Sequence, residues 1–190
     1  RLILTRMGQR RPGGFQGVPD LLTCKPHPDQ NVIYAVHYYQ PMPFTHQGAV
    51  WISTWYHPLR NVPWPLPAAN LAAALAQIDP KARGAEGARK ALNDQVNSGR
   101  STEAALDKDI QTVADWGKQN QRRLIIDEFG VYRKFAPRDA MLRYLKAITT
   151  AMRERGLAWT KWDYSNDYAI ITDPNAASAA RQLDAPVIAA

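Results

Sequence analysis

Residues 122–130 read Arg-Arg-Leu-Ile-Ile-Asp-Glu-Phe-Gly, a short apolar run that ends in two carboxylates, an aromatic ring and a glycine. The run is too short for a helix, so it predicts a strand buried in a parallel sheet. Alternation places Glu128 on the face of Leu124 and Ile126, with Asp127 on the opposite face. Parallel α/β sheets keep their active sites at the carboxyl ends of their strands. Glu128 is therefore a candidate catalytic residue, and a solvated strand end or a helix-capping acid is the alternative.

A second strand, predicted over residues 31–39, ends in the same way. Its two polar rings, His37 and Tyr39, follow Ile33 and Ala35 on one face. A further strand over residues 157–162 ends at Trp162, with Ala158 and Thr160 on the same face as that ring.

The order of elements indicates an α/β fold. Strands begin near Leu2, Val32, Leu124 and Leu157, and helices long enough for parallel crossovers begin at Ser101 and span Arg138 to Arg155. No low-complexity linker interrupts this order, and we treat residues 1–190 as one domain.

Composition excludes several classes of protein. The chain has 190 residues, of which 45% are hydrophobic and 22% charged, as in ordinary globular domains. No apolar run approaches the roughly 20 residues that cross a bilayer, so we expect no membrane partner. The chain also lacks the pattern of a secretory signal, so we expect any export signal to have been removed or to lie outside these residues. The net charge of +7 is spread along the chain without a nucleic-acid motif, so we expect no nucleic-acid partner. Cys24 is the only cysteine, which excludes an internal disulfide.

Several catalytic chemistries lack their motifs. His46 and His57 could suggest zinc, but no HExxH or comparable ligand spacing is present, and we expect no metal or other cofactor. Neither a GxSxG elbow nor a glycine-rich phosphate loop occurs.

The strand tips instead suit sugar chemistry. His37, Tyr39, Glu128 and Trp162 are expected at one rim, where a carboxylate can attack an anomeric centre and an aromatic ring can support a pyranose. Residues 40–67 form a long aromatic loop. Its rings could stack on a sugar or could plug one end of the core.

The sequence resembles the C-terminal half of a glycoside hydrolase family 5 enzyme, the cellulase family. The resemblance extends from about Leu21 to Tyr168. It rests on four ordered segments, which are Val32–Pro41, Phe44–Ala49, Ile126–Tyr132 and Trp159–Tyr164.

This resemblance implies strands five to eight of a (β/α)8 TIM barrel and a retaining endo-β-1,4-glucanase. Glu128 would be the nucleophile, His37 and Tyr39 would contact substrate and orient Glu128, and Trp162 would stack under the sugar. The substrate class would be a β-glucan, with mannan or another β-glycan as an alternative. An extracellular or periplasmic location is implied in the same way.

The sequence departs from the family in one respect. The family's acid/base glutamate lies in an Asn-Glu-Pro motif after strand four, and no Asn-Glu-Pro occurs in this chain. We therefore expect residues 1–190 to be a half barrel that is inactive alone and that pairs with the missing N-terminal half or with a second copy. A non-catalytic carbohydrate-binding half barrel is the competing hypothesis.

Overall fold

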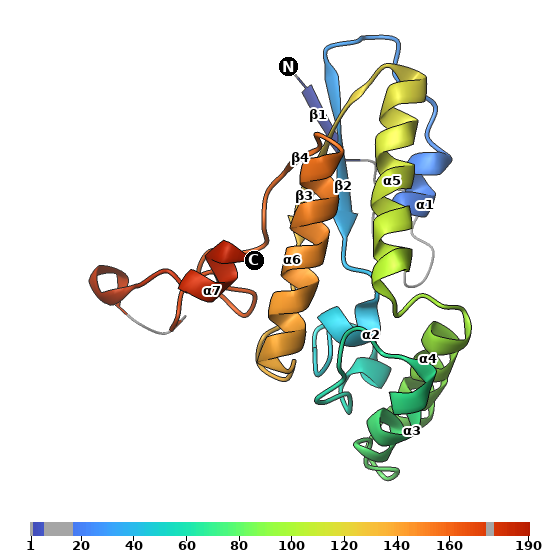
Figure 1. Cartoon of the computed structure of the whole chain (residues 1–190), viewed down its shortest axis with the longest axis vertical. Coiled ribbons are helices and arrows are strands. Elements are labelled where there is room, and N and C mark those ends of the chain that lie inside the picture. Colours follow the sequence, from blue (N-terminus) through green and yellow to red (C-terminus); the bar gives the residue numbers. More distant parts are fainter. Residues whose placement is uncertain (1, 6–16, 174–176) are drawn as a thin grey trace.

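The computed structural model describes residues 2–5, 17–173 and 177–190 (Figure 1). Within this part, the strands form one parallel sheet in the order β1-β2-β3-β4. The predicted class, α/β with a parallel sheet, is confirmed. The strands are β1 (Leu2–Thr5), β2 (Val32–Tyr38), β3 (Arg123–Phe129) and β4 (Ala158–Trp159).

Two long helices, α5 (Glu103–Asn120) and α6 (Arg138–Glu154), connect the later strands and lie side by side along the sheet (Figure 1). Both agree with the predicted crossover helices to within two residues. The shorter helices are α1 (Val18–Leu22), α2 (Met42–Thr45), α3 (Ala68–Ala76), α4 (Ala85–Asn97) and α7 (Ala185–Ala189), and the 3-10 turns are η1 (Thr54–Tyr56) and η2 (Ser178–Ala180).

The main core lies between the sheet and these two helices. Val36 of β2 and Ile126 of β3 face Ile110 of α5 and Ile148 of α6, and all four are at most 2% exposed. Ile125, which alternates with Ile126, is only half-buried. The helices therefore cover one face of the sheet, and the other face is the less protected one.

Helix α5 is held against β3 by a cap and a close contact. Thr102 accepts a hydrogen bond from the amide of Ala105 at 3.2 Å, which satisfies a free N–H of the first turn. Near the other end Gly117 makes room for Leu124, whose Cδ1 would lie 2.6 Å from a Cβ at this position and would have to shift. The predicted capping chemistry of the segment from Ser101 to Glu103 is confirmed at Thr102.

The alternation predicted for β3 is wrong at its carboxyl end. Val36 pairs with Ile126, but His37 pairs with Glu128, so Asp127 is the extra residue of a β-bulge. Beyond the bulge Phe129, and not Glu128, enters the helix-covered core. The bulge thus moves Glu128 to the face that carries His37.

The last strand is shorter than predicted. Only Ala158 and Trp159 pair as a strand, although the amides of Thr160 and Trp162 donate to the carbonyls of Ile126 and Phe129, each at 3.0 Å. The chain therefore follows β3 as far as Trp162, where the peptide bond to Asp163 is cis.

The region between β2 and α5 contains a second hydrophobic cluster. Residues 40–67, predicted as a loop, contain α2 and η1, and their Leu59 and Leu66 pack with Leu92 of α4. Of the loop's rings, Trp64 is buried whereas Trp51 is 51% exposed. Trp64 therefore fills the core, as the second interpretation predicted, and stacking of the exposed ring of Trp51 on a sugar stays a prediction.

Main-chain hydrogen bonds join the loops that follow β2, β3 and β4. The amide of Tyr132 donates to the carbonyl of Thr45 at 2.8 Å, and the amide of Arg133 donates to the carbonyl of Asp167 at 3.1 Å. The Arg133 guanidinium also donates to the carbonyl of Ile171 at 2.6 Å. These three loops form one rim. No helix in the described ranges is long and apolar enough to cross a membrane.

Candidate active site

Three of the predicted site residues meet at the carboxyl ends of β2 and β3. The Tyr39 hydroxyl donates to Glu128 Oε2 at 3.2 Å, and His37 Nδ1 lies 3.4 Å from the same oxygen. The side chains of His37 and Glu128 are 16% and 27% exposed, so Glu128 is held by two partners and still reaches solvent. A carboxylate oriented in this way can act as a nucleophile towards an electrophilic carbon.

Asp127 also belongs to this cluster, which the alternation of a regular strand did not predict. Its Oδ1 lies 3.5 Å from His37 Nε2, and that oxygen is buried without a hydrogen-bond donor in the described structure. The imidazole of His37 therefore lies between two carboxylates of consecutive residues. The β-bulge in β3 places Asp127 beside His37, and no pattern of residue types in the sequence predicts a bulge at this position.

Burial keeps the neighbouring ring groups neutral. Desolvation, followed by the negative charge of Glu128, raises the pKa of Tyr39 well above its ordinary value, so this phenol remains a hydrogen-bond donor. Burial lowers the pKa of His46 from 6.5 to about 4. His46 packs edge-on against Tyr39 with ring centroids 4.9 Å apart, and its Nδ1 lies 2.9 Å from Thr45 Oγ1. His46 therefore supports Tyr39 as an uncharged ring.

Trp162 lies on the next part of the rim. Its amide bonds the carbonyl of Phe129, the residue after Glu128, and its side chain is 47% exposed. Lys161 is anchored behind it, with Nζ bonded to the carbonyls of Trp162 and Tyr168. Burial lowers the pKa of Lys161 to about 8. The main chain of Trp162 is thus attached to the residue that follows Glu128, and its ring is partly exposed.

Aromatic side chains extend from the cluster across the rim. Tyr39 and Tyr168 have ring centroids 6.0 Å apart, as do Tyr168 and Tyr132, and Trp51 meets Tyr132 edge-on at 4.9 Å. Tyr168 and Tyr132 were not predicted, because isolated tyrosines in loops carry no positional signal. A row of ring contacts, buried as far as Tyr132, therefore joins Tyr39 beside Glu128 to the exposed ring of Trp51.

The histidines do not form a metal site within the described part of the chain. No group of three or more His, Cys, Asp or Glu side chains is arranged to hold a metal ion there. His46 instead belongs to the aromatic packing around Tyr39.

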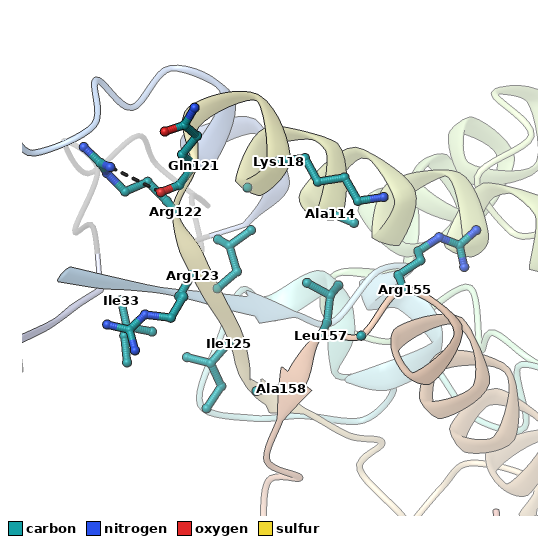
Figure 2. A pocket seen from close by; sticks show the side chains of 13 residues that line it. Ile33, Ala114, Lys118, Gln121, Arg122, Arg123, Ile125, Arg155, Leu157 and Ala158 are labelled. Carbon is teal, nitrogen blue, oxygen red and sulfur yellow. Dashed lines mark hydrogen bonds between the residues drawn. The ribbon is translucent and has the colours of Figure 1, made fainter. Parts of the chain in front are cut away.

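A pocket of about 570 Å³ opens at the amino ends of the strands, away from this rim. Figure 2 shows Lys118, Arg123 and Leu157 around it, with Ile125 at its side. Its lining contains four basic residues and neither Asp nor Glu. This pocket therefore offers no carboxylate for catalysis.

A parallel α/β sheet with a solvent-accessible carboxylate, an imidazole and a phenol at its carboxyl rim is consistent with part of an α/β barrel, a fold that keeps its active sites at this rim. Residues 12–168 match the family described as Cellulase (glycosyl hydrolase family 5). The chain belongs to this family.

Relatives with solved structures share the fold. The cellulose synthase subunit Z (CcsZ) of Clostridioides difficile superimposes with a TM-score of 0.65 at 21% identity, covering 94% of this chain and 46% of that one. The endoglucanase Cel5A of Thermotoga maritima gives a TM-score of 0.65 at 20% identity, covering 92% of this chain and 44% of that one. Cel5A has also been solved in complex with cellobiose and with mannotriose.

A curated relative, Endoglucanase 3 of Fibrobacter succinogenes (strain ATCC 19169 / S85), is 28% identical over 146 residues. The match covers 77% of this chain and 22% of that protein. The chain thus spans less than half the length of these relatives.

Proposed function

We propose that this chain is the nucleophile-bearing C-terminal half, strands five to eight, of a retaining endo-β-1,4-glucanase. The observation that carries the proposal is the geometry at Glu128, whose Oε2 accepts from Tyr39 at 3.2 Å and lies 3.4 Å from His37 Nδ1. Family membership supports the reaction class. Trp162 supplies the ring that stacks under the sugar, and Trp51 extends the surface along the chain of the polysaccharide.

The mechanism assigns Glu128 to attack on the anomeric carbon, which forms a glycosyl-enzyme ester as the glycosidic bond breaks. The leaving oxygen needs a proton from a second carboxyl about 5 Å from the first. The proposal places that carboxyl on the N-terminal half of the barrel, so residues 1–190 alone do not hydrolyse cellulose. The whole protein would act outside the cytoplasm, since cellulose is too large to enter a cell.

The edges of the sheet support a complementary half. Among the residues that the structure describes, β1 and β4 are the outer strands, and Trp159 of β4 is 43% exposed. Strand edges and large exposed rings favour pairing with further chain. A second copy of this chain is the alternative partner, which a sedimentation measurement distinguishes by its mass.

The nucleophile can be tested without the second carboxyl. A 2-fluoro cellobioside with a dinitrophenolate leaving group needs little protonation, so the chain alone should form a stable adduct on the peptide that contains Glu128. Glu128→Gln should abolish the adduct. Glu154→Gln, the same change at an exposed position of α6, should not affect it.

Two outcomes would contradict the proposal. An adduct on another residue, or none on a folded chain that binds cellobiose, would remove Glu128 from the nucleophile role and favour a non-catalytic binding module. Hydrolysis of carboxymethyl-cellulose by the 21.3 kDa chain alone would show that it needs no second half.

A mannan-degrading relative is the second candidate. Its support is the mannotriose complex of Cel5A, and the corresponding mannobioside tests it in the same assay. Faster labelling by the mannobioside than by the cellobioside would favour this specificity.

A further inference from the structure

Arg133, which follows β3 in the rim, holds the segment after β4 at three alternate residues. Its amide donates to the carbonyl of Asp167 at 3.1 Å, and its Nη1 donates to the carbonyls of Ala169 at 3.3 Å and Ile171 at 2.6 Å. Tyr168 lies between the first two of these carbonyls. The main chain on both sides of Tyr168 is therefore attached to one residue of the neighbouring loop.

The Arg133 guanidinium is shielded from solvent and has a further partner. Its side chain is 19% exposed, and its Nη2 donates to Asp184 Oδ2 at 3.3 Å. Asp184 is 2% exposed, and Ala169 and Ile171 are buried as well. A buried acceptor that loses its donor is costly because water cannot replace the lost hydrogen bond. These contacts therefore hold the guanidinium in one orientation.

The ring of Tyr168 connects this attachment to the candidate nucleophile. Tyr168 is 6% exposed, and its ring meets that of Tyr39 edge-on with centroids 6.0 Å apart. Its hydroxyl has no hydrogen-bond partner among the described residues, so the ring acts by contact. The Tyr39 hydroxyl donates to Glu128 Oε2 at 3.2 Å. A displaced Tyr168 would therefore let the Tyr39 ring turn and would lengthen that hydrogen bond.

We propose that Arg133 is a positioning residue for the candidate active site and acts through Tyr168 on the hydrogen bond from Tyr39 to Glu128. The ion pair of Arg133 is with Asp184, so the guanidinium does not act on Glu128 as a charge partner. Its effect passes through the main chain beside Tyr168 and then through the contact between the two tyrosine rings. The use of this contact in catalysis rests on the proposed function, in which Glu128 attacks the sugar.

Arg138 offers a matched comparison, because it shares one partner with Arg133. It bonds Asp184 through Nη1 at 2.9 Å and Nη2 at 2.6 Å, and in the described part of the chain its side-chain hydrogen bonds go to this carboxylate. Replacing either arginine by glutamine removes one positive charge and one partner of Asp184. Only Arg133→Gln also releases the carbonyl next to Tyr168, and it leaves the main-chain bond to Asp167 in place.

The first measurement needs no substrate and uses NMR signals of the Tyr39 ring in a chain with ¹³C-labelled tyrosine. The chain has eight tyrosines, and Tyr39→Phe identifies the signals of Tyr39. Arg133→Gln should shift these signals, whereas Arg138→Gln should leave them in place. If Arg133→Gln does not fold, Arg133→Lys takes its place, since lysine keeps the charge and lacks the planar fork that spans several acceptors.

The second measurement is the rate at which the 2-fluoro cellobioside labels Glu128. Arg133→Gln and Tyr168→Leu should each lower the limiting rate constant by roughly tenfold or more, with little change in the reagent concentration for half-maximal rate. Arg138→Gln should leave the rate constant unchanged. The double variant of Arg133 and Tyr168 should be no slower than the slower single variant, because both act through one contact. A loss of folded protein would lower the amount of adduct and leave its rate constant unchanged.

Unmoved Tyr39 signals in the folded Arg133 variant would overturn the proposal, and so would an equal shift in Arg138→Gln. Additive losses of rate in the double variant would also overturn it, because Arg133 and Tyr168 would then act independently. If the native chain forms no adduct, the proposed function fails, and the Tyr39 signals still decide the role of Arg133. The two failures are therefore distinguishable.

Discussion

Replacing Gly130 by alanine should disturb the rim where Trp162 is attached. A Cβ at this position would lie 2.4 Å from the Trp162 carbonyl oxygen and 3.0 Å from Tyr168 Cδ1. The carbonyl would have to move by about 1 Å to reach the 3.4 Å of ordinary contact. Overpacking of this kind costs about 1 to 3 kcal/mol, and the moving segment carries the Trp162 side chain.

The free energy of unfolding of Gly130→Ala should be measured in urea, and cellotriose binding should be measured by calorimetry. We expect a loss of about 2 kcal/mol and weaker binding. Gly99→Ala is the matched control, because its Cβ meets nothing within 4 Å and only its φ of +69° opposes the change. That control should cost about 1 kcal/mol and leave binding intact. Equal losses in both variants, with binding unchanged, would refute the reasoning.

Three further substitutions test the charge and hydrogen-bond assignments. The hydrogen bonds from Arg138 lower the pKa of Asp184, so Asp184→Asn should reduce the free energy of unfolding by about 2 kcal/mol at neutral pH. In thermal unfolding, the difference between the native chain and this variant should shrink as the pH falls below 3.8, where the native Asp184 becomes protonated. His46 is neutral when folded, so native stability should fall by about 3 kcal/mol between pH 6.5 and 4, and His46→Gln should flatten that slope in urea titrations. Tyr38→Phe removes the 3.0 Å hydrogen bond from the Tyr38 hydroxyl to Asp109 and should lower the free energy of unfolding by about 1 kcal/mol. An unchanged free energy of unfolding would show that this hydrogen bond does not stabilise the fold.

The sequence was a sufficient guide to β2 and β3 because a short, continuous apolar run is a local signature of a strand in a parallel sheet. The apolar runs of β2 and β3 predicted their strands, and the amphipathic pattern predicted α6. The carboxyl ends of the predicted strands then related His37, Tyr39 and Glu128 to one rim, and the structure brings these three together.

The position of Asp127 could not be predicted because it depends on pairing between strands. A regular strand places Glu128 in the core with Ile126, and only the bulge against β2 reverses this. Tyr168 was missed for a related reason, since its contact with Tyr39 joins loops that are far apart in the sequence. Such contacts arise from the tertiary fold and leave no local pattern.

The main-chain bonds that join the rim loops have a consequence for hydrogen exchange. The amides of Tyr132 and Arg133 donate to carbonyls of two other loops, so neither amide can exchange with solvent unless the loops separate. We expect these two amides to exchange at one common rate, slower than that of neighbouring exposed turns. The surface that faces the substrate then opens as a single cooperative unit, and a ligand that bridges Trp162 and Trp51 would slow the exchange of both amides together.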